Sequence, residues 1–143
     1  MKKILLLMVC LFSFSAVSFA DDDGPIPFSR LPQKAQGFIE NHFAYAQIQK
    51  VVMDENGDEY EVRMTGNIKI EFGKAGRWKE IEAKHRGVPA GIVPRHIMHK
   101  VRKQYGTKVR IMEISRDEDE IEVKLSNGKE LEFDRNRKNR DDD

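Results

Sequence analysis

The sequence predicts an α+β protein in which two similar halves share one antiparallel sheet, and three observations support this prediction. The stretch YEVRMTGNIKIEF at 60–72 returns 61 residues later as IEVKLSNGKELEF at 121–133. Both copies alternate apolar and polar residues on either side of a Gly/Asn turn, which is typical of a β-hairpin with one buried face. In each half, an apolar-Pro pair and an amphipathic helix pattern precede the hairpin.

We therefore expect a single domain at 21–143, made of two repeats over about 26–84 and 88–136, with a charged C-terminal tail. The tandem helix–antiparallel-strand repeats should form one sheet of about seven or eight strands, with two helices packed on one face. A chain of this length is large enough to bury a core, whereas each half of about sixty residues would be marginal alone. The two halves should therefore share their core.

The first twenty residues are typical of a secretory signal peptide. Lys2 and Lys3 supply the positive start, 4–14 is apolar, and Ser18 and Ala20 are small residues before a cleavage site. The apolar run is well short of the ~20 residues that span a bilayer, so we expect cleavage after Ala20 and no transmembrane segment beyond it. We predict a periplasmic or secreted protein.

Charge and cysteine content exclude several classes of function. Without Lys2 and Lys3, residues 21–143 contain 23 basic and 24 acidic residues. This near-neutral balance gives no general attraction to nucleic acid, and we expect no nucleic-acid partner. The only cysteine, Cys10, lies in the signal peptide, so neither disulfides nor thiolate chemistry is expected in the mature chain.

Each repeat is predicted to begin with a helix. The apolar face of the first consists of Leu31, Ala35, Phe38, Ile39 and Phe43, and that of the second of Val93, Ile97, Val101 and Tyr105. Pro32 and Pro94 suit a first helical turn, where a missing N–H costs nothing. Strands are expected next, at 48–53 and 109–114, and then the hairpins.

The first repeat has a further predicted strand at 77–83, which includes Trp78. In the second repeat RNRKNRDDD stands in that place, so the presence of a fourth strand there stays open.

The register of the hairpins also stays open. A loop of Thr65-Gly66-Asn67 pairs Met64 with Ile68 and sets Glu61 opposite Glu71, a repulsive pair. A shift of two residues improves the charge pairs but worsens the turn chemistry. Either register gives the same predicted core positions: Phe38, Ile39, Phe43, Tyr60, Val62, Ile70, Phe72, Ile97, Val101, Val123, Leu131 and Phe133.

The repeats resemble the PepSY-like family of exported bacterial proteins, which is related in fold to the β-lactamase inhibitory protein. The likeness is carried by LPQKAQGFIENHF (31–43), YEVRM (60–64), IKIEFGKAGRWKEIEA (68–83) and IEVKLSNGKELEFD (121–134). The resemblance implies an α+β domain with its helices on one side of the sheet, located in the periplasm or at the cell surface. It also implies inhibition or partner binding, because the inhibitory protein engages its target through a concave sheet face.

No motif in the sequence indicates catalysis, and no cofactor is expected. His96 and His99 are three apart on the second helix, but the cationic residues around them favour a solvated basic face over a metal site. Asp54, Asn56 and Asp58 resemble half of a calcium loop, although the EF-hand spacing is not met and a polar turn explains them better.

We therefore predict a non-enzymatic exported binding module, an inhibitor or regulator of another envelope protein or peptide, acting as a monomer. The alternatives are a small-molecule or calcium-binding protein, or an enzyme with a site between the repeats. Because strand side chains alternate, the polar residues opposite the core should form the partner face. Its expected members are Glu61, Arg63, Glu71, Glu122, Lys124 and Glu132, with Trp78 at its edge.

Overall fold

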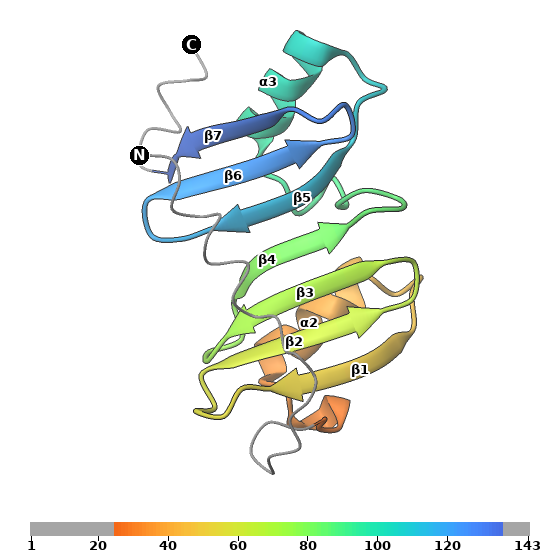
Figure 1. Ribbon diagram of the computed structural model, residues 1–143, viewed down its shortest axis with the longest axis vertical. Helices are drawn as coiled ribbons and strands as arrows, with labels where there is room; N and C mark the ends of the chain where they lie inside the picture. The colour runs from red at the N-terminus through yellow and green to blue at the C-terminus, as the bar shows by residue number, and fades with distance from the viewer. Residues whose placement is uncertain (1–24, 136–143) are drawn as a thin grey trace.

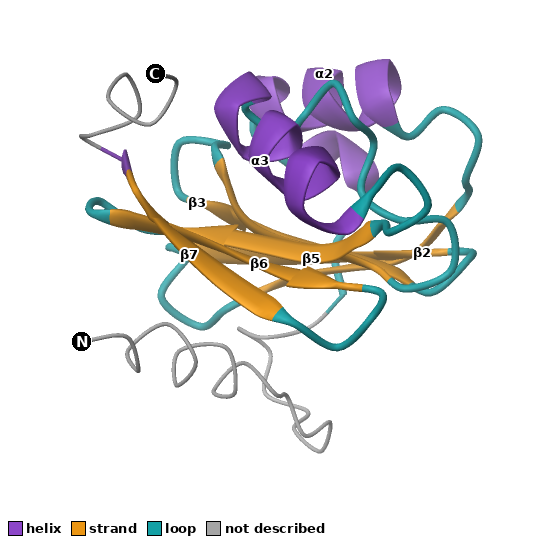
Figure 2. Ribbon diagram, turned by 90° about the horizontal axis from the view of Figure 1, so that it is seen from above, coloured by secondary structure: helices purple, strands orange, loops and turns teal. Residues whose placement is uncertain are grey.

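The computed structural model describes residues 25–135 and contains one antiparallel sheet with both helices on the same face (Figures 1 and 2). Seven strands lie side by side in chain order, from β1 to β7. The α+β fold predicted from the repeat is thereby confirmed. The predicted signal peptide, its cleavage after Ala20, and the tail at 136–143 where a fourth strand of the second repeat would fall lie outside the described residues.

The elements follow the predicted order. The first repeat consists of η1 (Phe28–Arg30), α2 (Gln33–His42), β1 (Ile48–Met53), β2 (Glu59–Met64), β3 (Ile68–Gly73) and β4 (Trp78–Ala83). The second consists of α3 (Arg95–Tyr105), β5 (Ile111–Arg116), β6 (Glu120–Leu125) and β7 (Glu130–Asp134). The strand expected at 109–114 begins two residues later, at Ile111. Just before it, the N–H of Arg110 donates a hydrogen bond to the hydroxyl oxygen of Ser126. None of the described helices is long and apolar enough to cross a membrane.

One hydrophobic core joins the two repeats. Of the twelve predicted core residues, nine are buried: Ile39, Phe43, Val62, Ile70, Phe72, Ile97, Val101, Val123 and Phe133. The other three, Phe38, Tyr60 and Leu131, are partly buried and pack against that core. Alternation along the strands directs these side chains toward the helices and leaves the opposite face to polar residues.

Both hairpins adopt the register set by their turns. Met64 pairs with Ile68, and Asn67 takes a positive φ of 59° in the loop, as its short polar side chain allows. As a result Glu61 lies directly opposite Glu71, and Glu122 lies opposite Glu132 in the second hairpin. Turn geometry and core burial therefore outweigh the repulsion between these carboxylates.

The repeats meet where β4 pairs with β5, which we call the repeat junction. Three residue pairs form this ladder: Glu80 with Ser115, Ile81 with Ile114, and Glu82 with Glu113. The chain between the two strands passes through α3. The junction thus joins segments about thirty residues apart along the chain.

A β-bulge decides the position of Trp78. Glu71 pairs with Glu80, but the next residue, Phe72, pairs with Trp78, so Lys79 is an extra residue in β4. The bulge turns Trp78 to the helix side, where its ring lies 6.5 Å from that of Phe38. The prediction that Trp78 lies at the edge of the partner face was therefore wrong, because the bulge buries its ring on the helix side.

Candidate functional site

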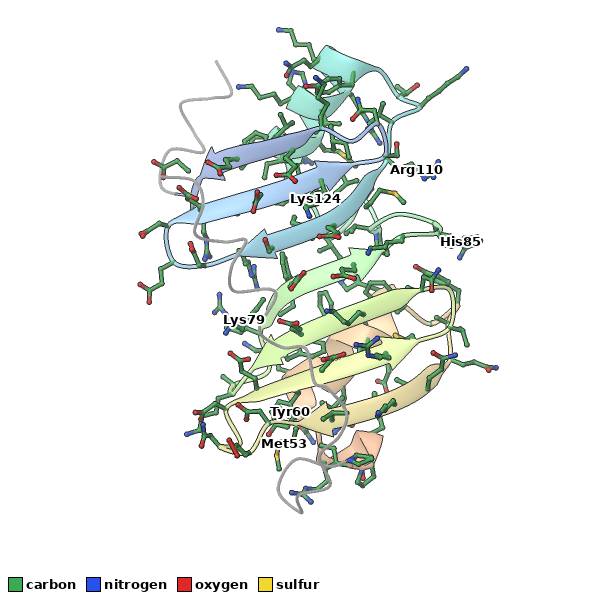
Figure 3. The ribbon with its side chains drawn as sticks, in the orientation of Figure 1. Met53, Tyr60, Lys79, His85, Arg110 and Lys124 are labelled. Atoms are coloured by element: carbon green, nitrogen blue, oxygen red, sulfur yellow. The ribbon has the colours of Figure 1, made fainter. Side chains whose placement is uncertain are left out.

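The open face of the sheet, opposite the helices, carries two rows of polar side chains that cross the strands (Figure 3). The carboxylate row contains Glu61, Glu71, Glu80, Ser115, Glu122 and Glu132, each paired with the next across neighbouring strands. The mixed row contains Lys50, Arg63, Lys69, Glu82, Glu113, Lys124 and Glu130 in the same way. We call these two rows, together with Lys84, the polar face.

Four glutamates of the carboxylate row are buried, an unusual condition for this residue type. Glu61 is 2% exposed and Glu80 is 3% exposed, while Glu71 and Glu122 are each 7% exposed. Among the described residues, one oxygen of Glu61, one of Glu71 and one of Glu80 accept no hydrogen bond. A buried carboxylate without enough donors is costly, so burial favours the protonated form of these side chains.

Burial changes the protonation of this row. It raises the pKa of Glu80 to about 8, and the neighbouring Glu71 and Glu82 act in the same direction. Burial also raises the pKa of Glu71 to about 7, although the ammonium of Lys69 opposes the change. For Glu113, burial is again the first cause of a raised pKa, followed by the charge of Glu82.

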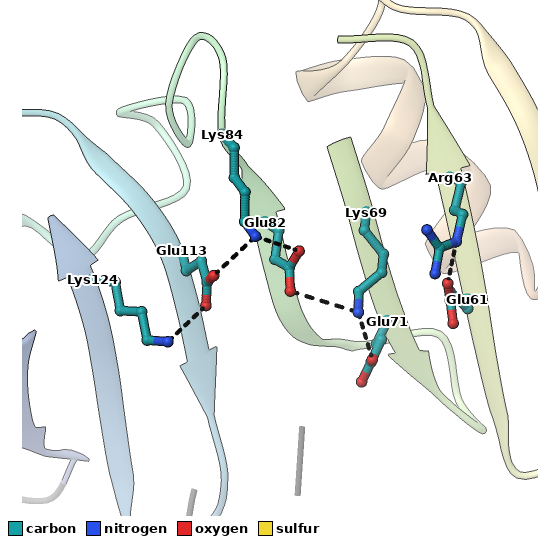
Figure 4. Close-up of polar contacts among 8 residues, drawn as sticks. All are labelled: Glu61, Arg63, Lys69, Glu71, Glu82, Lys84, Glu113 and Lys124. Carbon is teal, nitrogen blue, oxygen red and sulfur yellow. Dashed lines mark hydrogen bonds and ion pairs between the residues drawn. The ribbon is translucent and has the colours of Figure 1, made fainter. Parts of the chain in front are cut away.

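The mixed row is held by loose ion pairs, drawn in Figure 4. The ammonium of Lys69 lies 3.7 Å from Glu71 Oε2 and 3.6 Å from Glu82 Oε2. Lys124 lies 3.7 Å from Glu113 Oε1. These separations exceed ordinary hydrogen-bond lengths. The lysines therefore partly neutralise the charge of the carboxylates without donating hydrogen bonds to them. Arg63 differs, because its Nε donates to Glu61 Oε2 at 2.6 Å.

Three carboxylates of the polar face converge at the repeat junction. Glu80 and Glu82 are alternate residues of β4, and Glu113 pairs with Glu82 from β5. Each contributes an oxygen to a group whose members all lie within 4.8 Å of one another. Such a group can hold a hard cation, which prefers carboxylate oxygens.

These raised pKa values predict that stability falls as pH rises. In the unfolded chain Glu71 and Glu80 have their ordinary pKa of 4.5, so between pH 5 and 8 the folded state binds more protons. We expect the free energy of unfolding to decrease by roughly 1–3 kcal/mol over this range. Urea unfolding at each pH measures it.

Glu80→Gln should flatten this pH dependence, because it removes the group with the largest shift. Glu132→Gln, which changes an exposed carboxyl of the same row, should leave the dependence as in the parent protein. A free energy of unfolding that stays constant or rises from pH 5 to 8 in the parent would contradict the assignment.

A family model described as β-lactamase-inhibitor-like and PepSY-like matches residues 20–65 and again residues 58–139. The double match follows the two repeats. This chain belongs to the PepSY-like family. A comparison with curated proteins gives no match.

Three crystal structures of Bacteroides proteins resemble this PepSY-like chain. One, a periplasmic protein of Bacteroides thetaiotaomicron described as calcium-regulated, is 42% identical with a TM-score of 0.75. A periplasmic protein of the DUF2874 family from Bacteroides vulgatus is 40% identical with a TM-score of 0.74. For both, the match covers 81% of this chain and 92% of the other.

The third, a B. vulgatus periplasmic protein of unknown function, is 28% identical with a TM-score of 0.71. That match covers 78% of this chain and 91% of the other. All three are described as periplasmic, and neither these descriptions nor that of the family names an enzyme class.

In this PepSY-like protein the residues of the predicted calcium loop do not belong to the carboxylate group of Glu80, Glu82 and Glu113. Asp54 lies in the turn between β1 and β2, where its Oδ1 accepts the N–H of Asp58 at 2.9 Å and that of Glu59 at 3.3 Å. Asn56 is exposed in the same turn. The carboxylate of Asp54 thus serves the turn itself, as Asx turns do.

The two histidines of α3 have different surroundings. His96 packs edge-on against Phe133 at a ring distance of 6.0 Å, whereas His99 is exposed. The expectation of a solvated face holds for His99 and is wrong for His96, whose Nε2 is buried.

Six polar residues predicted to lie opposite the core come together on the open face of this PepSY-like protein: Glu61, Arg63, Glu71, Glu122, Lys124 and Glu132. Four further residues of this face were not predicted: Glu80, Glu82, Glu113 and Lys69. Glu80 and Glu82 alternate along β4 as residues of a solvated strand face do, yet Glu80 is buried. Their alternation was visible in the sequence, but their approach to Glu113 depends on the pairing of β4 with β5.

Proposed function

We propose that this protein is an exported, non-enzymatic binding module that recognises a positively charged segment of another envelope protein through its polar face. Export would follow cleavage of the signal peptide after Ala20. The periplasmic location of its relatives and the family's β-lactamase-inhibitor-like description support this proposal. The module would act by binding and regulating another envelope protein.

The observation that carries the proposal is the excess of carboxylates on a face that the helices leave open (Figure 2). The polar face has eight glutamates: Glu61, Glu71, Glu80, Glu82, Glu113, Glu122, Glu130 and Glu132. It has five cationic side chains, Lys50, Arg63, Lys69, Lys84 and Lys124. Even with Glu80 protonated, the carboxyl groups outnumber these cations, and such a surface attracts cationic partners and speeds their association.

A charge reversal on β7 tests the proposal. Glu130 and Glu132 are exposed, so Glu130→Lys with Glu132→Lys should leave the fold intact. Capture of envelope proteins by the exported bait, in EDTA, should yield a partner whose association rate falls about tenfold with the reversed bait and with added salt. Quantitative mass spectrometry and surface plasmon resonance measure the two effects.

The matched control reverses two exposed glutamates away from the polar face, Glu40 on α2 and Glu118 in the turn before β6. Glu40→Lys with Glu118→Lys makes the same change in net charge and should leave capture unchanged. Equal recovery by both reversed baits would show that the polar face is not the docking surface.

A second candidate function, calcium regulation, is favoured by two observations. One relative with 42% identity is described as calcium-regulated. The group formed by Glu80, Glu82 and Glu113 offers oxygen ligands of the type that Ca²⁺ prefers. Calcium titration of the exported protein tests this candidate.

A further inference from the structure

We propose that Glu80, Glu82 and Glu113 bind one divalent cation of the calcium class at the repeat junction, in exchange for the ammonium of Lys84. The proposal rests on the second candidate function and adds to it the site, the ligands and the competing group. It places the cation on the polar face, between the last strand of one repeat and the first strand of the next.

Strand pairing fixes the geometry of the three ligands. Glu80 and Glu82 project from the same side of β4, and the ladder sets Glu113 of β5 directly beside Glu82. Oxygens from the three carboxylates lie within 4.8 Å of one another. A cation with ligand distances of ~2.3–2.6 Å fits among oxygens at this spacing.

A second observation points to a ligand at this position. Glu80, a member of the group, is 3% exposed, and among the described residues its Oε1 accepts no hydrogen bond. The backbone register also sets Glu80 beside Glu71 on the neighbouring strand, where two ionised carboxylates would repel each other. A bound cation would satisfy the buried oxygen and offset this repulsion.

Lys84 occupies part of the same space. Its Nζ lies 3.7 Å from Glu82 Oε1 and 3.9 Å from Glu113 Oε2, between two of the three ligands (Figure 4). Its side chain is 55% exposed, so it can swing into solvent at little cost. Divalent cation binding should therefore displace Lys84, and the lysine should weaken binding by competition.

The chemistry of the ligands selects the metal. Three carboxylates supply oxygen alone, with no imidazole or thiolate, which disfavours Zn²⁺ and Cu²⁺. Glutamate side chains are long and flexible, and they can each coordinate through one or two oxygens. This adaptability suits the irregular coordination of Ca²⁺ better than the strict octahedron of Mg²⁺.

Isothermal titration of the protein recovered from the periplasm with CaCl₂ tests the site directly. We expect one Ca²⁺ per molecule and weaker binding of Mg²⁺. Glu80→Gln and Glu113→Gln should each weaken Ca²⁺ binding at least tenfold, because each removes a ligand oxygen's charge. Lys84→Gln should tighten binding about threefold or more, because it removes the competitor.

Glu132→Gln is the matched control, since it neutralises an exposed glutamate of the polar face outside the group. It should change the affinity less than twofold. Circular dichroism of each variant verifies folding, and line broadening by Mn²⁺ should affect the amide signals of β4 and β5 first.

Some results would contradict both the proposed site and calcium regulation, and others would contradict the site alone. Absence of Ca²⁺ binding up to 10 mM would overturn both the site and calcium regulation. Ca²⁺ binding that survives Glu80→Gln and Glu113→Gln, or that Lys84→Gln weakens, would overturn this site alone. The assay contains no partner protein, so it is independent of docking through the polar face.

Discussion

Replacement of Phe72 by alanine should lower the free energy of unfolding by about 3–5 kcal/mol. Phe72 is fully buried under α2, where its ring meets that of Phe38 edge-on at 5.9 Å. It also pairs across the sheet with Tyr60 on one side and Trp78 on the other. Alanine would leave a cavity among aromatic rings that close packing prevents from collapsing. Urea denaturation followed by circular dichroism measures the loss.

Tyr45→Ala is the control for this experiment, because Tyr45 is an aromatic residue that is 47% exposed. Its replacement should cost about 1 kcal/mol or less. Since one core spans both repeats, Phe72→Ala should also unfold in a single transition and destabilise the second repeat equally. A loss below about 1 kcal/mol, or separate transitions for the two halves, would contradict the shared core.

Replacement of Gly76 by alanine should cost about 3 kcal/mol, although it adds a single carbon atom. Gly76 has a φ of +92°, a conformation that side chains disfavour. A Cβ at this position would approach Pro32 Cβ and Lys34 Cβ to 3.0 Å and the backbone nitrogen of Ala35 to 3.1 Å. The start of α2 would therefore have to move away from the β3–β4 turn. Thermal and urea unfolding measure the cost.

Gly57→Ala separates the two causes. Gly57 has a similar φ of +73°, but a Cβ there would meet no atom within 4 Å. Its replacement should cost only the conformational strain, about 1 kcal/mol. If Gly76→Ala costs no more than Gly57→Ala, the contact between the turn and α2 does not limit stability.

The fold could be predicted because each sequence pattern that indicates a helix or a hairpin occurs in both repeats. Each helix pattern, apolar-Pro pair and alternating hairpin occurs twice, so a chance pattern in one half is tested by the other. The hairpin register could not be predicted, since the Gly66-Asn67 turn favours one register and the charges of Glu61 and Glu71 favour another. The structure shows that the turn prevails.

The candidate site could be predicted only in part. Alternation correctly placed Glu61, Arg63 and Lys124 opposite the core, because side chains within a regular strand follow a fixed period. Trp78 could not be placed in this way, because a bulge adds one residue to β4 and interrupts the period. The approach of Glu113 to Glu82 depends on a pairing between distant strands, and no local pattern encodes the register of such a pair.

One strand position at the repeat junction carries opposite charges in the two repeats. Glu113 faces Lys124 on its hairpin side, and the position equivalent to it in the first copy is Lys50, which faces Arg63. A lysine at position 113, as at the equivalent position of the first repeat, would face Glu82 as an ordinary ion pair. The carboxylate cluster therefore depends on this charge difference between the two repeats. Because its ligands come from β4 and β5, neither repeat contains the whole cluster.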